Sequence, residues 1–274
     1  GRVELMFNEN VIFSVSRPIE QMDYFYKNAD GDDLIFVHEG TGTLESQFGH
    51  LRFREGDYLV IPHGTIWRLV FDALPAKLVW IEAIGGQIET PRRYRNEYGQ
   101  LLEHSPFCER DIRVPETLET RTDIGDFEVR IHRRGRVYAY HYEHHPFDVV
   151  GWDGYVYPWA FNINDFEPIT GRIHMPPPVH QTFEGPGFVV CSFCPRMLDY
   201  HPQAIPVPYN HSNLDSDEVL YYVNKKFGSR RGIEVGSITL HPSGIPHGPQ
   251  PGAVEASLGA TYTEELAVMM DTFR

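Results

Sequence analysis

One twelve-residue phrase occurs twice in this chain, and its two copies lie 180 positions apart. Residues 56–67 read GDYLVIPHGTIW and residues 236–247 read GSITLHPSGIPH. Both follow the pattern G-x5-P-x-G-x2, and they differ at the position that comes next, which is Trp67 in the first copy and His247 in the second. A phrase repeated at this distance predicts two similar β-barrels in tandem.

The second copy carries possible metal ligands that the first copy lacks. The same offsets, applied upstream, align three residues of each copy: His211, Asn213 and Glu218 with Gly31, Asp33 and His38. Alternate residues of a strand point to the same face, so His211 and Asn213 project inward together and Glu218 follows after a turn. The second copy therefore holds two histidines and a carboxylate in register. The simpler alternative is that these are polar residues lining a barrel mouth, as we expect for His38.

The turn residues of the second copy explain how its last histidine reaches the site. Gly236 and Gly244 permit tight turns, and Pro242 fixes the approach of His247 from a neighbouring strand. Two histidines and one carboxylate leave one face of an octahedral metal open, as in non-haem Fe(II) enzymes that bind substrate and O2 together. The spacing thus predicts a metal centre with His211, Glu218 and His247 as ligands.

Composition limits the partners of this 274-residue chain. The formal net charge of -14 argues against nucleic acid as the main partner, and an anionic substrate would need a local cation. No apolar run is long enough to span a bilayer, so we expect no membrane partner. Three cysteines, Cys108, Cys191 and Cys194, fit a reducing compartment such as the cytoplasm. We expect Cys191 and Cys194 to pack in a strand, because no second pair completes a zinc site.

Most segments read as short strands. Period-two or β-rich runs occur at residues 33–37, 58–61, 77–81, 188–193 and 219–223, and residues 127–140 predict two strands joined at a glycine turn. Residues 264–271 have helical propensity, but we favour a closing strand. The Met175–Pro178 run predicts a stiff, extended connection. The pair His144 and His145 is expected on a solvated surface, because neighbouring side chains on a strand point to opposite faces.

The repeated phrase is similar to the second signature of the cupin superfamily, and His211, Asn213 and Glu218 resemble its first signature. Over nearly its whole length the chain further resembles the homogentisate 1,2-dioxygenase family. The matching stretches are NADGDDLI (28–35), PFDVVGW (146–152), VHQTF (179–183), FVVCSFCPR (188–196), YNHSN (209–213) and LHPSGIPHGP (240–249). The resemblance implies ring opening of homogentisate by O2 to maleylacetoacetate, in tyrosine and phenylalanine breakdown.

We therefore expect an all-β fold of tandem jelly-roll (double cupin) barrels. Residues 1–160 would form an N-terminal barrel without a metal site, together with a bridging segment that begins near residue 106. Residues 161–274 would form the C-terminal barrel with the iron site. The resemblance also implies a homo-oligomer, a trimer or a hexamer.

The family's site residues carry over to positions of this chain. His211, Glu218 and His247 match the iron ligands, and His174 matches a proposed acid/base histidine. Some members place the carboxylate one residue closer to the first histidine, so Asp217 is a rival ligand.

Four further residues are expected around the substrate: His241, Arg230, Phe227 and His180. His241 matches a substrate-contacting histidine, and Arg230 stands where a lysine occurs, so it could supply the cation that an acetate side chain needs. Phe227 falls on a substrate-contacting tyrosine of the family and lacks its hydroxyl.

Three alternatives stay open at this point. One is a ring-cleaving dioxygenase of another hydroquinone such as gentisate, which Phe227 favours. Another is a cupin isomerase that uses Mn or Zn without redox chemistry. The third is a non-catalytic double cupin that binds a metabolite.

Overall fold

The computed structural model describes residues 1–173, 180–207 and 209–273, which form two compact units. The first unit comprises Gly1–Ile88 and Glu109–Asn162, and the second comprises Glu89–Cys108 and Ile163–Arg274. The segment Glu89–Cys108 thus belongs with the second unit although the chain then returns to the first. The domain limits expected from the sequence, 1–160 and 161–274, stay a prediction.

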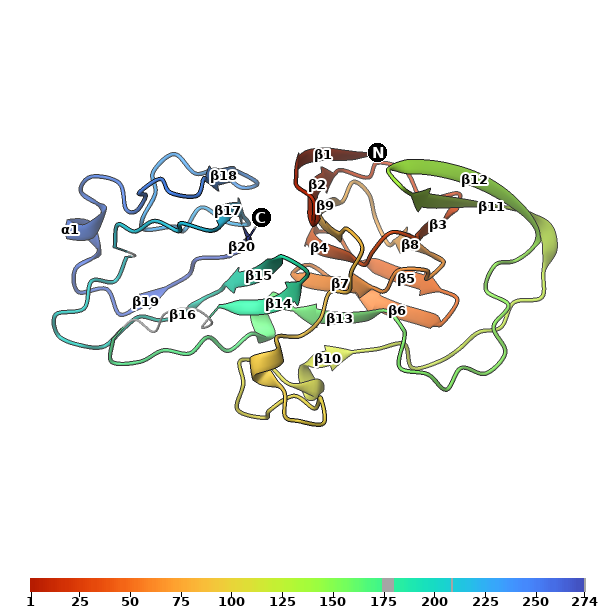
Figure 1. The fold of residues 1–274 in the computed structure, drawn as a ribbon, viewed down its shortest axis with the longest axis horizontal. Helices are drawn as coiled ribbons and strands as arrows, with labels where there is room; N and C mark the ends of the chain where they lie inside the picture. Colours follow the sequence, from red (N-terminus) through yellow and green to blue (C-terminus); the bar gives the residue numbers. More distant parts are fainter. Residues whose placement is uncertain (174–179, 208, 274) are drawn as a thin grey trace. The chain divides into compact units, whose positions relative to one another are not determined.

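The first unit is built from two sheets (Figure 1). The seven-stranded sheet has the order β1 (Arg2–Phe7), β2 (Val11–Ser16), β9 (Lys77–Ala83), β4 (Asp33–Glu39), β7 (Asp57–Ile61), β13 (Trp159–Asn162), β10 (Ile112–Arg113). The six-stranded sheet has the order β12 (Arg136–His144), β11 (Ile124–Arg133), β3 (Phe25–Asn28), β8 (Trp67–Phe71), β5 (Gly42–Ser46), β6 (Gly49–Phe53). Segment 106–160, expected as a bridge, supplies strands to both sheets.

Alternation along the strands creates the core of this unit. In β5 and β8 every second residue is buried, which is the pattern of strands with one face turned inward. Trp67 is 1% exposed, and its ring centroid lies 5.3 Å from that of Tyr26 and 6.1 Å from that of Trp80. The tryptophan that replaces a histidine in the first copy of the phrase is therefore a core residue.

The second unit has a five-stranded sheet and a two-stranded one. The order of the larger sheet is β14 (Gln181–Gly185), β15 (Phe188–Phe193), β20 (Ala267–Thr272), β17 (Asp217–Tyr222), β18 (Ile238–His241). The smaller pairs β16 (Arg196–Met197) with β19 (Tyr262–Thr263). Leu220, Tyr222 and Ala267 form a buried cluster on which Phe193 and Phe227 pack.

Helices are short. The described residues hold one α-helix, α1 (Ala253–Ser257), and three 3-10 helices, η1 (Arg92–Tyr94), η2 (Glu109–Asp111) and η3 (Ile163–Asp165). None of the helices described is long and apolar enough to cross a membrane.

The strand predictions agree with the structure in most places. The chain is nearly all β. Most of the segment 264–271 lies in strand β20 (Ala267–Thr272), as predicted, and β11 and β12 form the predicted hairpin with Gly135 at its turn. The Met175–Pro178 run lies outside the described residues.

The expectation for one histidine was wrong. His145 is 4% exposed, and its ring centroid lies 5.0–5.1 Å from those of Phe25, Phe127 and Phe147. It lies just beyond the end of β12, where the chain turns inward, so strand alternation does not apply to it. Burial lowers the pKa of His145.

Candidate metal centre

Three side chains of the second unit converge as the repeat predicts. One ligand atom each of His211, Glu218 and His247 lies within 4.8 Å of the other two. His211 and His247 come from segments joined by an isolated antiparallel bridge, in which each backbone N–H donates to the other residue's carbonyl at 2.8 Å. Glu218 comes from strand β17 and is 7% exposed, so the carboxylate forms the floor of the site.

Backbone carbonyls fix the protonation of both histidine rings. Nδ1 of His211 lies 2.9 Å from the carbonyl oxygen of Tyr209, and Nδ1 of His247 lies 3.1 Å from that of Ile245. A carbonyl oxygen only accepts, so each Nδ1 carries the proton and each Nε2 presents a lone pair. Nε2 of His247 is 3.1 Å from Oε2 of Glu218, and Nε2 of His211 is 3.8 Å from Oε1.

This donor set suits a divalent cation. The Nε2 lone pairs of the two imidazoles and the carboxylate oxygens all point at one place and repel one another. A cation bound between them would remove this repulsion. A backbone carbonyl behind a metal-binding histidine is a common way to hold its ring. The residues present therefore fit a metal ion.

Glu218 is also held from outside the triad. The side-chain amide of Asn213 donates a hydrogen bond to Oε1, and Nδ1 of His241 lies 3.1 Å from Oε2. Burial raises the pKa of Glu218, but the hydrogen bond with His241 and the nearby histidines outweigh burial, so the net pKa is lowered. The side-chain amide of Asn213 therefore orients the carboxylate.

A chain of hydrogen bonds runs from Arg230 to the carboxylate. Nη2 of Arg230 lies 2.6 Å from Nε2 of His241. A guanidinium only donates, so Nε2 of His241 accepts and its Nδ1–H donates to Glu218. The cation expected for an acidic substrate is thus linked to the carboxylate through a single histidine.

Glycines of the repeated phrase place these groups. Gly236 and Gly244 have φ values of 83° and 74°, a region that glycine enters without strain. The N–H of Gly244 donates to the carbonyl of Asn213 at 2.7 Å, which ties the turn before His247 to the segment of His211.

The rival carboxylate points elsewhere. Oδ1 of Asp217 accepts a hydrogen bond of 2.7 Å from the backbone N–H of Ser243. Because neighbouring side chains on a strand point to opposite faces, Glu218 and Asp217 cannot both face the histidines. The geometry favours Glu218.

The other expected substrate residues have different surroundings. Phe227 packs against Tyr222 and Phe193, with ring centroids 4.7 and 6.5 Å apart, and the ring of His180 lies 4.5 Å from Phe193. Tyr222 and Glu218 share one face of β17, so this aromatic cluster continues the face that carries the carboxylate. His174 lies outside the described residues.

Sequence reasoning missed Asp271. It is the direct partner of Glu218 across β17 and β20, as His241 is across β17 and β18, so the three side chains form one row. Burial, and then the charge of Glu218, raise the pKa of Asp271 to about 7. Only the strand register brings this carboxyl to the site.

The aligned positions of the first unit are arranged differently. Asp33 lies 3.2 Å from the amide of Asn28 and 3.7 Å from Arg2, and His38 is buried. Within the described part of the chain, His211, Glu218 and His247 form the single group of His, Cys, Asp and Glu residues that could share an ion.

Comparison with known proteins places these residues in context. The family described as homogentisate 1,2-dioxygenase N-terminal matches residues 10–163. A protein from Saccharolobus solfataricus, whose name assigns it provisionally as a dioxygenase, is 48% identical over 99% of this chain and 70% of its own length. Homogentisate 1,2-dioxygenases from Drosophila melanogaster and Bradyrhizobium diazoefficiens are 25% and 26% identical over 88% and 92% of this chain.

The chain covers only part of those two enzymes, 55% and 58% of their lengths. Among solved structures, a mutant of Bacillus subtilis oxalate decarboxylase aligns with 99% of this chain and 72% of its own, at 13% identity and a TM-score of 0.45. A cupin 2 conserved barrel domain protein from Leptotrichia buccalis aligns with 100% of this chain and 88% of its own, at 11% identity and a TM-score of 0.41.

Proposed function

The chain belongs to the homogentisate 1,2-dioxygenase family, and we propose that it binds Fe(II) and opens the ring of homogentisate with O2 to give maleylacetoacetate. The observation that carries the proposal is the convergence of His211, Glu218 and His247, with Arg230 and His241 hydrogen-bonded beside them. This reaction would belong to tyrosine and phenylalanine breakdown. Because the chain is shorter than the curated enzymes, its activity and its assembly as a trimer or hexamer are part of the proposal.

The three ligands would hold the iron through two Nε2 atoms and one carboxylate. Such a set leaves coordination positions for a chelating substrate and for O2. Three protein ligands with open positions are typical of non-haem Fe(II), whereas structural zinc is usually held by four protein ligands. When bound, Fe(II) supplies the unpaired electrons through which triplet O2 reacts with a singlet aromatic ring.

Arg230 and His241 would bind and orient the substrate. The chain carries a net charge of -14, which repels a carboxylate at long range, so binding depends on a local cation. The side chain of Arg230 has five N–H donors, and one contacts His241, so others remain for the acetate group. The aromatic cluster of Tyr222, Phe193 and Phe227 would keep water from this face of the barrel.

His174 would act as the base that removes a proton from the substrate hydroxyl. A neutral imidazole titrates near the working pH, which suits this task. The variant His174→Gln should keep its metal and still bind substrate, while kcat falls by about 10^2 to 10^4. Loss of metal would make His174 a ligand, and unchanged turnover would move the role to His180 or His241.

Gentisate is the second candidate substrate, because Phe227 provides no hydroxyl where the family has a tyrosine. Its ring stands edge-on to Tyr222 at an interplanar angle of 87°, in an apolar cluster. A hydroquinone bound there would lack one hydrogen bond of the family's enzymes.

An oxygen-electrode screen tests the proposal. The protein is loaded with Fe(II) without air and then offered homogentisate, gentisate or hydroquinone, with Glu218→Ala as the matched control. We expect rapid O2 uptake with homogentisate, and none in the control. Faster uptake with gentisate would make gentisate the substrate. If none of the three compounds causes O2 uptake, and the protein loaded with Mn or Zn shows isomerase activity, the proposal is replaced by a non-redox isomerase.

A further inference from the structure

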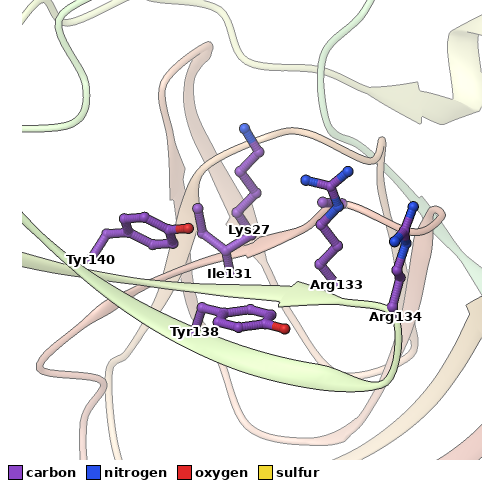
Figure 2. Close-up of a pocket in the computed structure, with 7 residues that line it drawn as sticks. Lys27, Ile131, Arg133, Arg134, Tyr138 and Tyr140 are labelled. Atoms are coloured by element: carbon purple, nitrogen blue, oxygen red, sulfur yellow. The ribbon is translucent and has the colours of Figure 1, made fainter.

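The first unit contains a cavity of about 520 Å3 that none of the site residues line. Figure 2 shows its side chains, with Tyr140 and Ile131 toward one end, Arg133 and Arg134 toward the other, and Lys27 and Tyr138 on either side. Sites for small molecules commonly have this size and combine an apolar surface with a few charged groups.

The register of three strands explains why these side chains meet. Strand β3 pairs in parallel with β11, which pairs in antiparallel with β12, so Lys27, Ile131 and Tyr138 lie opposite one another in a single row. Arg133 and Tyr140, each two residues further along, share the same face. Earlier on this face, Phe25 and Val129 are covered by Phe147. Phe147 does not cover the part of this face that carries the two tyrosines, and Tyr138 and Tyr140 are 44% and 51% exposed.

The cations of this cavity differ from most other arginines of the unit, which are paired with carboxylates. The paired arginines are Arg2, Arg52, Arg68, Arg110, Arg113, Arg121 and Arg130. Within the described residues, no carboxylate lies within ion-pair distance of the side chains of Lys27, Arg133 or Arg134. Three unpaired positive charges in a chain with a net charge of -14 form a local site for an anion.

The turn of the hairpin fixes the direction of one cation. Arg134 has a φ of 52°, and of the described residues it is the only one other than glycine with a positive φ. Its backbone N–H donates to the carboxylate of Asp30, which holds the turn against β3. The side chain of Arg134 is therefore presented by a well-defined backbone.

We propose that this cavity, formed by Lys27, Arg133, Arg134, Tyr138 and Tyr140, binds an organic anion that joins phosphate groups to a planar ring, such as a nucleoside phosphate. The guanidinium groups offer planar, paired donors to phosphate oxygens. The tyrosine rings and Ile131 offer a surface on which a planar base stacks. This binding belongs to the first unit and does not depend on the metal centre.

Isothermal titration of the intact protein with ATP, pyrophosphate and adenosine tests the proposal. We expect ATP to bind most tightly, because the other two each lack one half of the recognised chemistry. Arg133→Ala and Tyr138→Ala should each weaken ATP binding by about tenfold, the effect of losing one charge-assisted or stacking contact. Arg136→Ala is the matched control, since Arg136 follows the same turn but does not line the cavity. It should change the Kd by less than about threefold.

Two results would overturn the site. One is the absence of saturable ATP binding to the wild-type protein, and the other is an equal loss in Arg133→Ala and Arg136→Ala, which would indicate general charge attraction. Equal affinities for pyrophosphate and ATP would overturn the part assigned to the tyrosines. All variants change exposed side chains, and tryptophan fluorescence checks that the first unit is folded, because all four tryptophans lie in it.

Discussion

Glu218 is the residue on which the proposed metal centre depends. Its two oxygens accept hydrogen bonds from Asn213 and His241, so both are oriented before any ion binds. A carboxylate held in this way loses little freedom on binding a metal, which favours affinity.

Substituting Glu218 and Asp217 one at a time tests which of these two adjacent carboxylates binds the metal. Glu218→Ala should abolish Fe(II) binding, because only two neutral ligands would remain. Asp217→Ala should keep the metal and lose only the hydrogen bond to the N–H of Ser243, at a cost of about 1–2 kcal/mol in unfolding free energy. Anaerobic Fe(II) titration of both variants measures this, and the reverse order of affinities would assign Asp217 as the ligand.

For single residues, the sequence predicted those groupings that follow from the spacing of residues along the chain. The offsets from the repeated phrase placed His211, Glu218 and His247 together. They could not show that Asp271 joins the row, because its position depends on the register of β20 against β17, which pairs residues about fifty positions apart. Nor could they show the Arg230–His241 contact, which depends on side-chain orientation.

Among the elements, strand β8 begins with the tryptophan that distinguishes the first copy. Trp67 is buried against Tyr26 and Trp80, so Trp67→Ala should lower the unfolding free energy by about 3–5 kcal/mol. Denaturant unfolding followed by the fluorescence of the other tryptophans measures the loss. A change below about 1 kcal/mol would contradict its role as a core residue.

Strands β4, β9 and β11 bring a buried charge cluster together. Burial, and then the charge of Glu82, raise the pKa of Asp33 to about 7. The hydrogen bond with Glu82 raises the pKa of His132, and the two side chains are 3.0 Å apart. Both groups therefore hold protons more tightly in the folded state than in the unfolded state.

The contribution of Asp33 and His132 to the stability of the first unit should consequently fall as pH rises. Groups with raised folded pKa values favour the folded state when protonated, and this advantage is lost as pH passes their folded pKa values. Their contribution to the unfolding free energy should decrease between about pH 5 and pH 8, whereas the buried His38 and His145, whose pKa values are lowered, act in the opposite direction. Asp33→Asn should remove the part of this contribution that comes from Asp33, because the amide does not titrate. Denaturant unfolding of the wild type and of Asp33→Asn at several pH values measures it, and the same pH dependence in both proteins would contradict the account.

For the whole molecule, the predicted all-β fold is confirmed by the strand arrangement. Period-two patterns located the strands because each has one buried face. The sequence could not predict which segments belong to each unit, because segment 89–108 joins the second unit through long-range contacts. Glu89 exchanges backbone hydrogen bonds of 2.9 Å with Glu184, and the hydroxyl of Tyr94 donates to the carbonyl of Gln181.

The central claim is that the chain holds one metal ion, bound by the second unit and not by the first. Metal analysis after anaerobic Fe(II) loading and desalting tests it in the wild type, in His247→Ala and in the matched control His38→Ala. We predict about one iron per chain in the wild type and in His38→Ala, and almost none in His247→Ala. Two tightly bound ions per chain, or iron retained in His247→Ala, would contradict the account.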